Sequence, residues 1–306
     1  VAFTLFGVRE HREDTPRKPF SLGLKKVVST IRGNDQLMWI ALIFLIQQVG
    51  NNLVVGGVGS TYIYFTFGYS GGLYSTFSTI GMMATAILMI FYPAISRKIH
   101  RKKLMSIMMA MSTVGYVLML VAGFLLGGSG LCFGVLTVGY MLSNFGQYGF
   151  YLVMMISIIN TVEYNEYKTG NRDEAIIASV RPFVTKLSGA LIAVITSVSY
   201  MIFGVTNYTN QISGYEQMAS AGSITEAEKL SLIESVLAGV ERGQSLGLLL
   251  CMTILPCVLV LISYFLYKKH YMLDKIHTKH DTNLDMTNVN LLRAALTTFI
   301  CGDAVK

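Results

Sequence analysis

The sequence carries little charge for its length. Asp, Glu, Lys and Arg make up only 13% of its 306 residues, whereas a soluble domain usually carries about 25%. So few charges cannot cover the surface of a soluble globule of this size, and a soluble helical bundle would need a charged outer face. Intrinsic disorder requires low hydrophobicity and high charge, and the apolar content of 53% excludes it.

Motifs for enzyme chemistry are also lacking. The four cysteines show no CxxC spacing, and the sequence contains no P-loop, HExxH or nucleophile-elbow pattern. Cys132, Cys251 and Cys257 lie in apolar segments, where a buried free thiol is the usual state. We therefore expect neither enzyme activity nor a metal site.

What the sequence does have is long stretches without any charged residue. They are Leu37–Ser96, Leu104–Val162, Leu187–Tyr215 and Gly243–Tyr267. Because a helix needs about 20 apolar residues to cross a bilayer, the first two stretches have room for two spans each and the others for one. The sequence therefore predicts an all-α membrane protein with six transmembrane helices, near residues 37–65, 73–95, 104–126, 131–161, 175–203 and 246–267.

The basic residues predict the orientation of these helices. All but two of the 24 lysines and arginines lie in the segments 1–36, 97–103, 162–186 and 268–306. By the positive-inside rule these segments are cytoplasmic, which places both ends of the chain on the same side, as an even number of spans requires. The net charge of +7 thus indicates topology and not a surface for nucleic acid.

Three regions follow from this reading. Residues 1–36 are predicted to be the end of a preceding helix and a cytoplasmic interdomain linker, residues 37–267 the six-helix bundle, and residues 268–306 a cytoplasmic tail. Within the external loop 204–245, the capping-box pattern that begins at Thr225 predicts a short helix. On this interpretation the chain is a piece of a larger membrane protein.

Polar residues interrupt two of the predicted helices near their middle. Gln47, Asn51 and Asn52 lie in the first helix, and Asn144 and Gln147 lie in the fourth. These two helices are the first members of two consecutive sets of three helices. Matching polar segments in them indicate two inverted three-helix repeats with a binding site at the membrane midplane. The alternative is that small and polar residues there only allow close helix packing.

Lys186 is the most unusual residue in the predicted spans. If the fifth helix begins near Ala175, Lys186 lies about 16 Å along it, about halfway across a hydrocarbon core of about 30 Å. A lysine there needs an acid, water or a ligand, unless it reaches the membrane surface by snorkelling. Arg181 lies nearer the cytoplasm, and Pro182 between the two is expected to loosen the helix.

A charged segment precedes that helix, and we assign it to a cytoplasmic gate. A run of exposed charges is the simpler alternative. The gate assignment comprises Glu163, Glu166, Lys168, Arg172, Glu174 and Arg181.

The same segment carries a family resemblance. It resembles the glycoside–pentoside–hexuronide:cation symporters of the major facilitator superfamily, and within them the streptococcal-type lactose or galactoside permeases and the melibiose carrier. The resemblance covers roughly residues 1–275. Its residues are Glu163-Tyr164-x-Glu166-Tyr167-Lys168-x-Gly170-x-Arg172-x-Glu174, followed by Val184-x-Lys186-x-x-Gly189-Ala190.

This resemblance implies the C-terminal half of a twelve-helix carrier in a bacterial cell membrane. Such a carrier moves a galactoside or other glycoside, such as lactose or melibiose, together with H⁺ or Na⁺ by alternating access. Lys186 would match the family's lysine beside the sugar and cation region, while most cation ligands would lie in an N-terminal half that this chain does not contain. The alternatives are a carrier of another solute on this fold, or a stand-alone six-helix structural or regulatory membrane protein.

Overall fold

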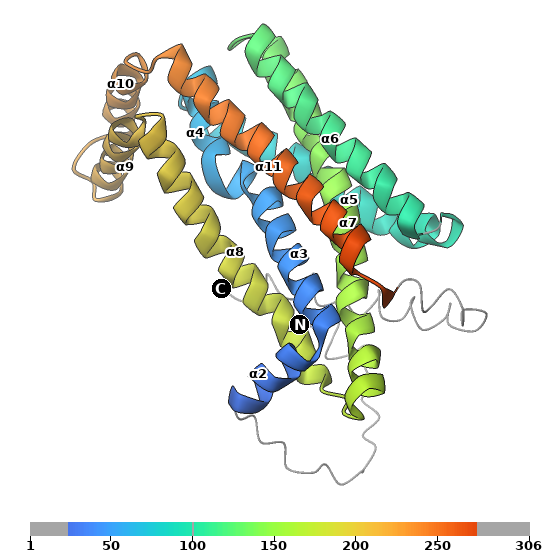
Figure 1. Ribbon diagram of the computed structural model, residues 1–306. Helices are drawn as coiled ribbons and strands as arrows, with labels where there is room; N and C mark the ends of the chain where they lie inside the picture. Colours follow the sequence, from blue (N-terminus) through green and yellow to red (C-terminus); the bar gives the residue numbers. More distant parts are fainter. Residues whose placement is uncertain (1–23, 100, 274–306) are drawn as a thin grey trace, which may run out of the picture.

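The computed structural model describes residues 24–99 and 101–273, and throughout these residues the ordered elements are helical (Figure 1). The first span is built from three consecutive pieces, and two short helices separate the last two spans. The elements are α2 (Leu24–Gly33), α3 (Asp35–Asn52), the π-helical segment η1 (Val54–Val58), α4 (Gly59–Phe67), α5 (Gly71–Lys98), α6 (Arg101–Leu125), α7 (Gly130–Thr169), α8 (Glu174–Ile202), α9 (Thr206–Ser220), α10 (Glu226–Leu237) and α11 (Arg242–His270).

Six of the described helical segments are long and apolar enough to cross a membrane. The predicted all-α fold with six spans is therefore confirmed. The spans are Asp35–Phe67, Gly71–Ser96, Lys103–Leu125, Gly130–Thr169, Glu174–Ile202 and Arg242–His270.

The fourth span is longer than the sequence suggested. α7 continues past residue 161 to Thr169 and ends where Gly170 adopts a left-handed conformation with φ +71°. Such a C-cap favours glycine because it lacks a Cβ atom. Most of the segment expected to be a charged loop is therefore the end of a helix, and only residues 170–173 connect it to α8.

The first span is interrupted, whereas the fifth is not. Gly57 within η1 has φ −129° and ψ −116°, so the helical hydrogen-bond ladder breaks there. The hydroxyl of Tyr74, on the neighbouring α5, donates to the carbonyl oxygen of Val55 at 2.7 Å, which satisfies a polar group at the break. α8, by contrast, remains helical through Pro182, although a proline cannot donate the usual backbone hydrogen bond to the preceding turn.

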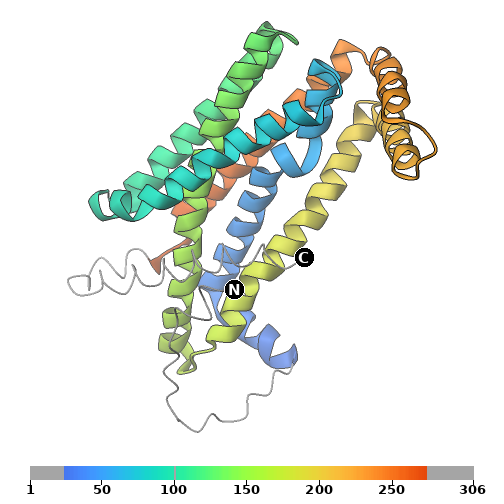
Figure 2. The same ribbon diagram turned by 180° about the vertical axis from the view of Figure 1, so that it is seen from behind.

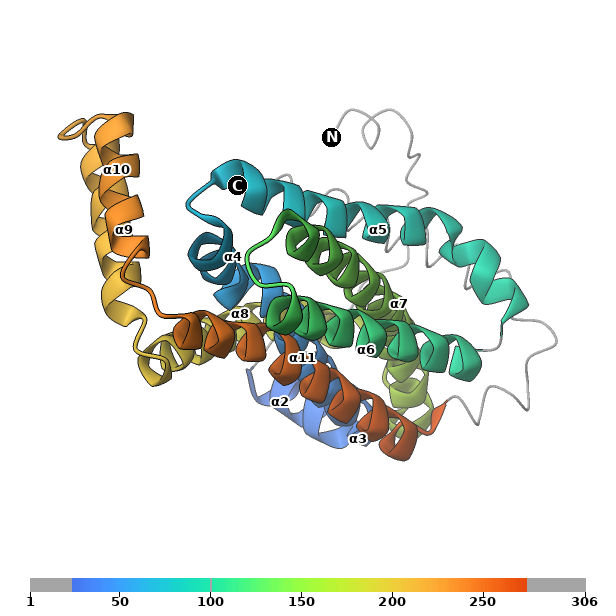
Figure 3. The ribbon, with the colours of Figure 1, turned by 90° about the horizontal axis from the view of Figure 1, so that it is seen from above.

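The first three spans and the last three spans make corresponding packing contacts. α3 packs against α8 and α11, and α7 packs in the same way against α5 and α6. The two leading helices, α3 and α7, also pack against each other, as α6 does against α11 (Figure 3). This arrangement fits the predicted pair of inverted three-helix repeats.

The closest helix pair depends on glycine. At Gly146 of α7, a methyl group would collide with the main chain of Met108 and Ser112 on α6. Backbones that approach so closely are typical of helix association in membranes, where small residues permit close van der Waals packing. We therefore expect α6 and α7 to move as one unit.

The two ends of the bundle differ, and we name them by their extra helices. The α2 end comprises α2, the start of α3, the end of α7, residues 170–173 and the end of α11. The hairpin end comprises the turn after α4 and the helices α9 and α10, which lie apart from the spans (Figures 1 and 2). α10 begins with the predicted capping box at Thr225, whereas α9 was not expected.

Candidate functional site

A chain of amide groups joins three spans at the centre of the bundle. The Nε2 atom of Gln47 on α3 donates to the Oε1 atom of Gln147 on α7 at 3.2 Å. Gln147 in turn donates from Nε2 to the hydroxyl of Tyr116 on α6 at 2.9 Å. Both glutamines are at most 1% exposed. The predicted midplane residues of the first and fourth spans thus meet directly.

Asn144 makes a second link between spans. Its Nδ2 atom donates to the carbonyl oxygen of Gly81 on α5 at 2.9 Å, and the side chain is buried. Asn51 and Asn52 are half-exposed instead, and Asn52 donates only to the carbonyl oxygen of Gln48 in its own helix, at 2.9 Å. These two asparagines therefore remain accessible at the level where the buried amides hold the helices.

The buried amides have a structural role in this arrangement. A polar side chain buried in an apolar phase is stabilising only when it is hydrogen-bonded, and Gln147 and Asn144 are bonded to neighbouring helices. The Oε1 atom of Gln47 is buried and has no partner among the described residues. The assignment of these residues to a substrate site stays a prediction.

Lys186 lies on an exposed face of α8. It forms no ion pair with any residue between 24 and 99 or 101 and 273. It lies twelve positions after Glu174 at the helix start, which corresponds to about 18 Å along the helix. The lysine is therefore deep in the span and outside the packed core.

Two different exposed faces run along α8. Large apolar side chains suited to lipid occupy one of them, and small or polar residues occupy the other, together with Lys186. The first face includes Phe183, Leu187, Val194 and Met201; the second includes Lys186, Gly189, Ala193 and Ser197. Because small residues mark surfaces where helices meet in membranes, the second face is suited to another protein surface or a cavity.

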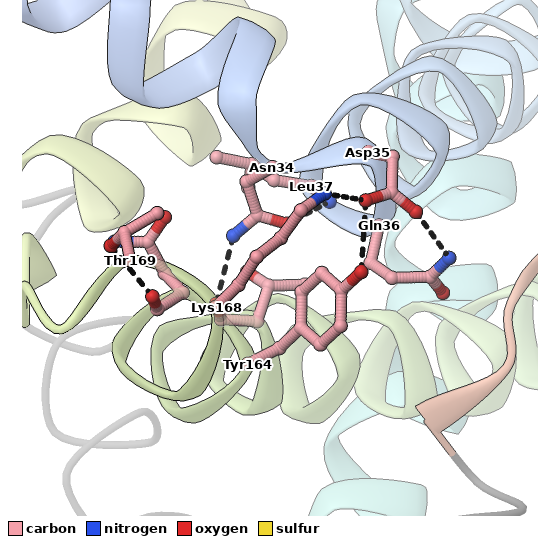
Figure 4. Close-up of polar contacts among 9 residues, drawn as sticks. Asn34, Asp35, Gln36, Leu37, Tyr164, Lys168 and Thr169 are labelled. Carbon is pink, nitrogen blue, oxygen red and sulfur yellow. Dashed lines mark hydrogen bonds and ion pairs between the residues drawn. The ribbon is translucent and has the colours of Figure 1, made fainter.

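At the α2 end, one carboxylate joins the first and fourth spans (Figure 4). The Oδ1 atom of Asp35, at the start of α3, accepts from Nζ of Lys168 at 2.6 Å and from the hydroxyl of Tyr164 at 2.9 Å. Its Oδ2 atom accepts from Nε2 of Gln36 at 3.1 Å. Lys168, predicted to belong to a gate, is thus paired within this bundle.

Asn34 stabilises the same junction (Figure 4). Its side-chain oxygen accepts from the backbone N–H of Leu37 at 2.9 Å and so caps α3. Its Nδ2 atom donates to the carbonyl oxygen of Thr161 in α7 at 2.9 Å. Because Asn34 is fully buried, both hydrogen bonds are shielded from water.

A second carboxylate joins α2 to the connection between α7 and α8. Asp173 forms an ion pair with Lys26 at 3.2 Å and accepts from the hydroxyl of Thr30 at 2.9 Å. Its side chain is only 10% exposed. Two residues of α2 are therefore fastened to the segment that leads into the helix of Lys186.

The remaining predicted gate residues form a local network. Arg172 pairs with Glu166 at 3.3 Å and with Glu174 at 3.5 Å, and all three side chains are exposed. Glu163 is exposed and Arg181 is half-buried. The gate residues thus lie at one end of the bundle, although their function as a gate stays a prediction.

Sequence reasoning missed Asp35 and Asp173 as the centres of these contacts. Both lie next to predicted spans, but nothing in the local sequence says which distant segments will meet there. An acid directly after the N-cap residue Asn34 was the only available signal, since acids are favoured in the first turn of a helix.

Aromatic residues also bring the first and last spans together at the α2 end. The rings of Trp39 on α3 and His270 on α11 are stacked, with centroids 3.7 Å apart and planes inclined by 13°. The backbone N–H of Met272, just after α11, donates to Oε1 of Gln36 at 3.0 Å. The start of the first span and the end of the last therefore share two contacts.

At the hairpin end, tyrosines make the contacts between neighbouring segments. The Tyr69 hydroxyl donates to Oε1 of Glu216 on α9 at 2.6 Å, and burial, together with the charge of Glu216, raises the pKa of Tyr69. The rings of Tyr64 and Tyr69 have centroids 4.9 Å apart. The α9–α10 hairpin is thus attached to the turn between α4 and α5.

Comparison with known proteins adds the evolutionary context. A family model described as MFS/sugar transport protein matches residues 1–275. The raffinose carrier protein of Pediococcus pentosaceus is 30% identical over 230 residues, which cover 73% of this chain and 31% of that protein. A lactose permease of Lactobacillus delbrueckii subsp. bulgaricus is 32% identical over 199 residues, covering 64% and 30%.

A second lactose permease, from Leuconostoc lactis, is 30% identical over 214 residues, which cover 69% of this chain and 30% of the permease. The chain thus spans about a third of the length of the curated relatives it matches.

Proposed function

Because the chain belongs to the MFS/sugar transport protein family, a family of transporters and not of enzymes, we propose that it is the C-terminal half of a carrier that moves a sugar together with a cation. The sugar would bind between this six-helix bundle and a second one, and alternating exposure of that site to the two sides of the membrane would carry it across. The cation would be H⁺ or Na⁺.

The observation that carries this proposal is the position of Lys186. A lysine deep in a span is costly unless it faces a partner, a cavity or a ligand. Lys186 lies on the face of α8 that bears small residues, beside Gly189 and Ala193 and away from the apolar face of Phe183. A second bundle across this face would supply both the partner and a water-accessible cavity.

The substrate proposal rests on the named relatives. They are a raffinose carrier and lactose permeases, and both sugars contain a galactose unit, so a galactoside is the substrate class we propose. Half-exposed Asn51 and Asn52 are suited to hydrogen-bond sugar hydroxyls, because amides can donate and accept. Buried Gln47, Asn144 and Gln147 would then position the helices that carry the site.

The orientation follows from charge. Exposed basic residues gather at the α2 end, including Lys25, Arg32 and Lys268, whereas Glu216 and Glu234 lie at the hairpin end. By the positive-inside rule the α2 end faces the cytoplasm. The gate residues Glu166, Arg172 and Glu174 and the acids Asp35 and Asp173 would then control the cytoplasmic mouth of the carrier.

Uptake measurements on the intact carrier that contains this chain test the proposal. Galactoside accumulation driven by an ion gradient should be lost in Lys186→Ala, and the matched control Phe183→Ala, on the apolar face of the same helix, should retain it. Lys186→Arg keeps the charge and should retain part of the accumulation. Normal accumulation in Lys186→Ala would place this lysine among residues that only snorkel to the surface.

Two results would contradict the wider proposal. If the intact carrier accumulates another solute but no galactoside, the fold carries a different substrate. If no second bundle is needed for a stable, functional protein, the chain acts as a six-helix protein by itself.

A further inference from the structure

The helix α2 lies directly at the start of the first span. Only Asn34 separates its last residue, Gly33, from Asp35 at the beginning of α3. In Figure 1 it runs obliquely below the spans, at the base of α8. Because α2 directly precedes the first span, we expect it to lie where the hydrocarbon core gives way to the lipid headgroups.

One face of α2 is fastened to the bundle. Lys26 and Thr30, one helical turn apart, both bind Asp173, and Ile31 packs against the hydrophobic core formed by the spans. These contacts fix the rotation of the helix about its axis. The opposite face must therefore point away from the bundle.

That outward face combines positive charge with one apolar side chain. Val28 is 48% exposed and lies three residues after Lys25 and four residues before Arg32, both of which are exposed. Residues at these spacings are neighbours on a helix surface. Both features suit a helix in a membrane interface, because apolar burial and attraction of basic residues to anionic lipids each contribute to binding there.

The acids near α2 are already engaged by other cations. Asp35 pairs with Lys168, and Asp173 pairs with Lys26. Glu166 and Glu174 share Arg172. Within the residues that the structure describes, Lys25 and Arg32 form no ion pair.

Four more exposed lysines lie at the same end of the bundle. With Lys25 and Arg32 they surround the ends of the spans with positive charge. They are Lys98, Lys103, Lys268 and Lys269.

We propose that α2 is an interfacial helix whose outward face, formed by Lys25, Val28 and Arg32, binds the phosphate headgroups of anionic lipids. Val28 would enter the boundary between headgroups and acyl chains, and the two cations would bind phosphate groups beside it. Because the inner face holds Asp173, the lipid contact would be transmitted to the connection that leads into α8. This proposal is independent of the nature of the transported solute.

The expected preference can be estimated from charge. A basic residue near an anionic membrane surface contributes about 1 kcal/mol, so two such residues correspond to about a thirtyfold preference for an anionic surface over a neutral one. This attraction weakens with added salt, since the interaction is screened over about 10 Å at 0.1 M salt.

Fluorescence quenching in reconstituted membranes tests the proposal. A fluorophore is attached at Ser29→Cys, an exposed position of α2, after Cys132, Cys251, Cys257 and Cys301 are replaced by alanine. Doxyl-labelled lipid near the headgroups is the quencher. Quenching should increase when phosphatidylglycerol replaces about a third of a neutral phosphatidylcholine membrane, and the increase should disappear in the double variant Lys25→Gln, Arg32→Gln.

The matched control is Arg242→Gln, which removes an exposed cation at the hairpin end and should leave the lipid response unchanged. Quenching that is the same in neutral and anionic membranes would overturn the proposal. So would an unchanged response in the double variant, or an equal response to inorganic phosphate added to neutral membranes, which would identify a free anion as the ligand.

A second measurement avoids the cysteine replacements. Mass spectrometry of the otherwise unmodified chain released from anionic membranes should show fewer retained phosphatidylglycerol molecules for the double variant than for the parent and for Arg242→Gln. Equal retention in all three proteins would also overturn the proposal.

Discussion

At the α2 end, ion pairs between carboxylates and lysines join the helices, whereas at the hairpin end a hydrogen bond from a tyrosine hydroxyl to a carboxylate and contacts between aromatic rings do so. Asp35 binds two side chains of α7, and Asp173 binds two side chains of α2. The corresponding contacts at the other end are those of Tyr69 with Glu216 and Tyr64. Ion pairs are screened by salt, so the contacts between helices at the α2 end should respond more strongly to salt concentration than those at the hairpin end.

The close packing of α6 against α7 should make these two spans one unit, and the largest expected effect tests this rigidity. Gly146→Ala would force a methyl group against the main chain of Met108 and Ser112. Overpacking of this kind costs about 3 kcal/mol, and we expect a marked fall in the melting temperature measured in detergent. Gly134→Ala, on the same helix but facing open space, is the control. A small change in both variants would mean that α6 and α7 are not rigidly joined.

Helix capping gives the next largest difference between the ends. Asn34→Ala removes a cap and a hydrogen bond to Thr161 in a buried place, so we expect a loss of about 2 kcal/mol. Ser70→Ala removes the corresponding cap of α5 at the hairpin end, where the hydrogen bond is longer, at 3.4 Å. We expect a loss of about 0.5 kcal/mol there. Equal losses in detergent unfolding would contradict the proposed difference in how firmly the two ends are held.

A smaller effect concerns the carboxylates themselves. Asp173→Asn should cost about 1 kcal/mol, because it removes the charge that Lys26 and Thr30 bind. The loss should shrink as the salt concentration rises toward 1 M, where screening acts over about 3 Å. Tyr69→Phe at the hairpin end should show no comparable salt dependence, because the hydrogen bond that it removes has a neutral donor. If the stability losses of the two variants change with salt in the same way, the contacts at the two ends do not differ in their electrostatic character.

The smallest effect belongs to the hairpin end and depends on pH. Hydrogen bonds from the backbone and hydroxyl of Thr225 lower the pKa of Glu228 below its ordinary value of 4.5. The contribution of this carboxylate to α10 is therefore complete above that value and is lost as the pH falls through the lowered pKa. Amide exchange of α10, corrected for its intrinsic pH dependence, should show less protection at about pH 3 than at about pH 6. Thr225→Ala should reduce protection at both pH values. If protection of α10 depends on pH in this variant as it does in the parent, the capping box is not the cause of that dependence.

The positions of the spans could be predicted because burial in lipid excludes charge over long stretches. The charge-free stretch Leu37–Ser96 therefore located the first two spans well, and the predicted helix 175–203 agrees with α8. The end of α7 was placed too early because the charged residues after Val162 indicated the membrane boundary, and a helix can continue into water until a residue such as Gly170 ends it. α9 was missed because its polar sequence lacks a sustained apolar stripe.

The candidate site was predictable only in part. Gln47 and Gln147 stood out because polar groups are rare in apolar stretches, and they meet in the structure. The break at Gly57 had only neighbouring glycines as a signal. The pairing of Asp35 with Lys168 depends on how distant helix ends come together, which local sequence does not specify.

The stacked rings of Trp39 and His270 give the chain an optical reporter. Trp39 is the only tryptophan in the sequence, and it lies 3.7 Å from an imidazole on the last span. Indole emission depends on the groups that contact the ring, so separation of the two stacked rings should change it. The emission of one side chain thus reports, without any added dye, whether the first and last spans are together or apart.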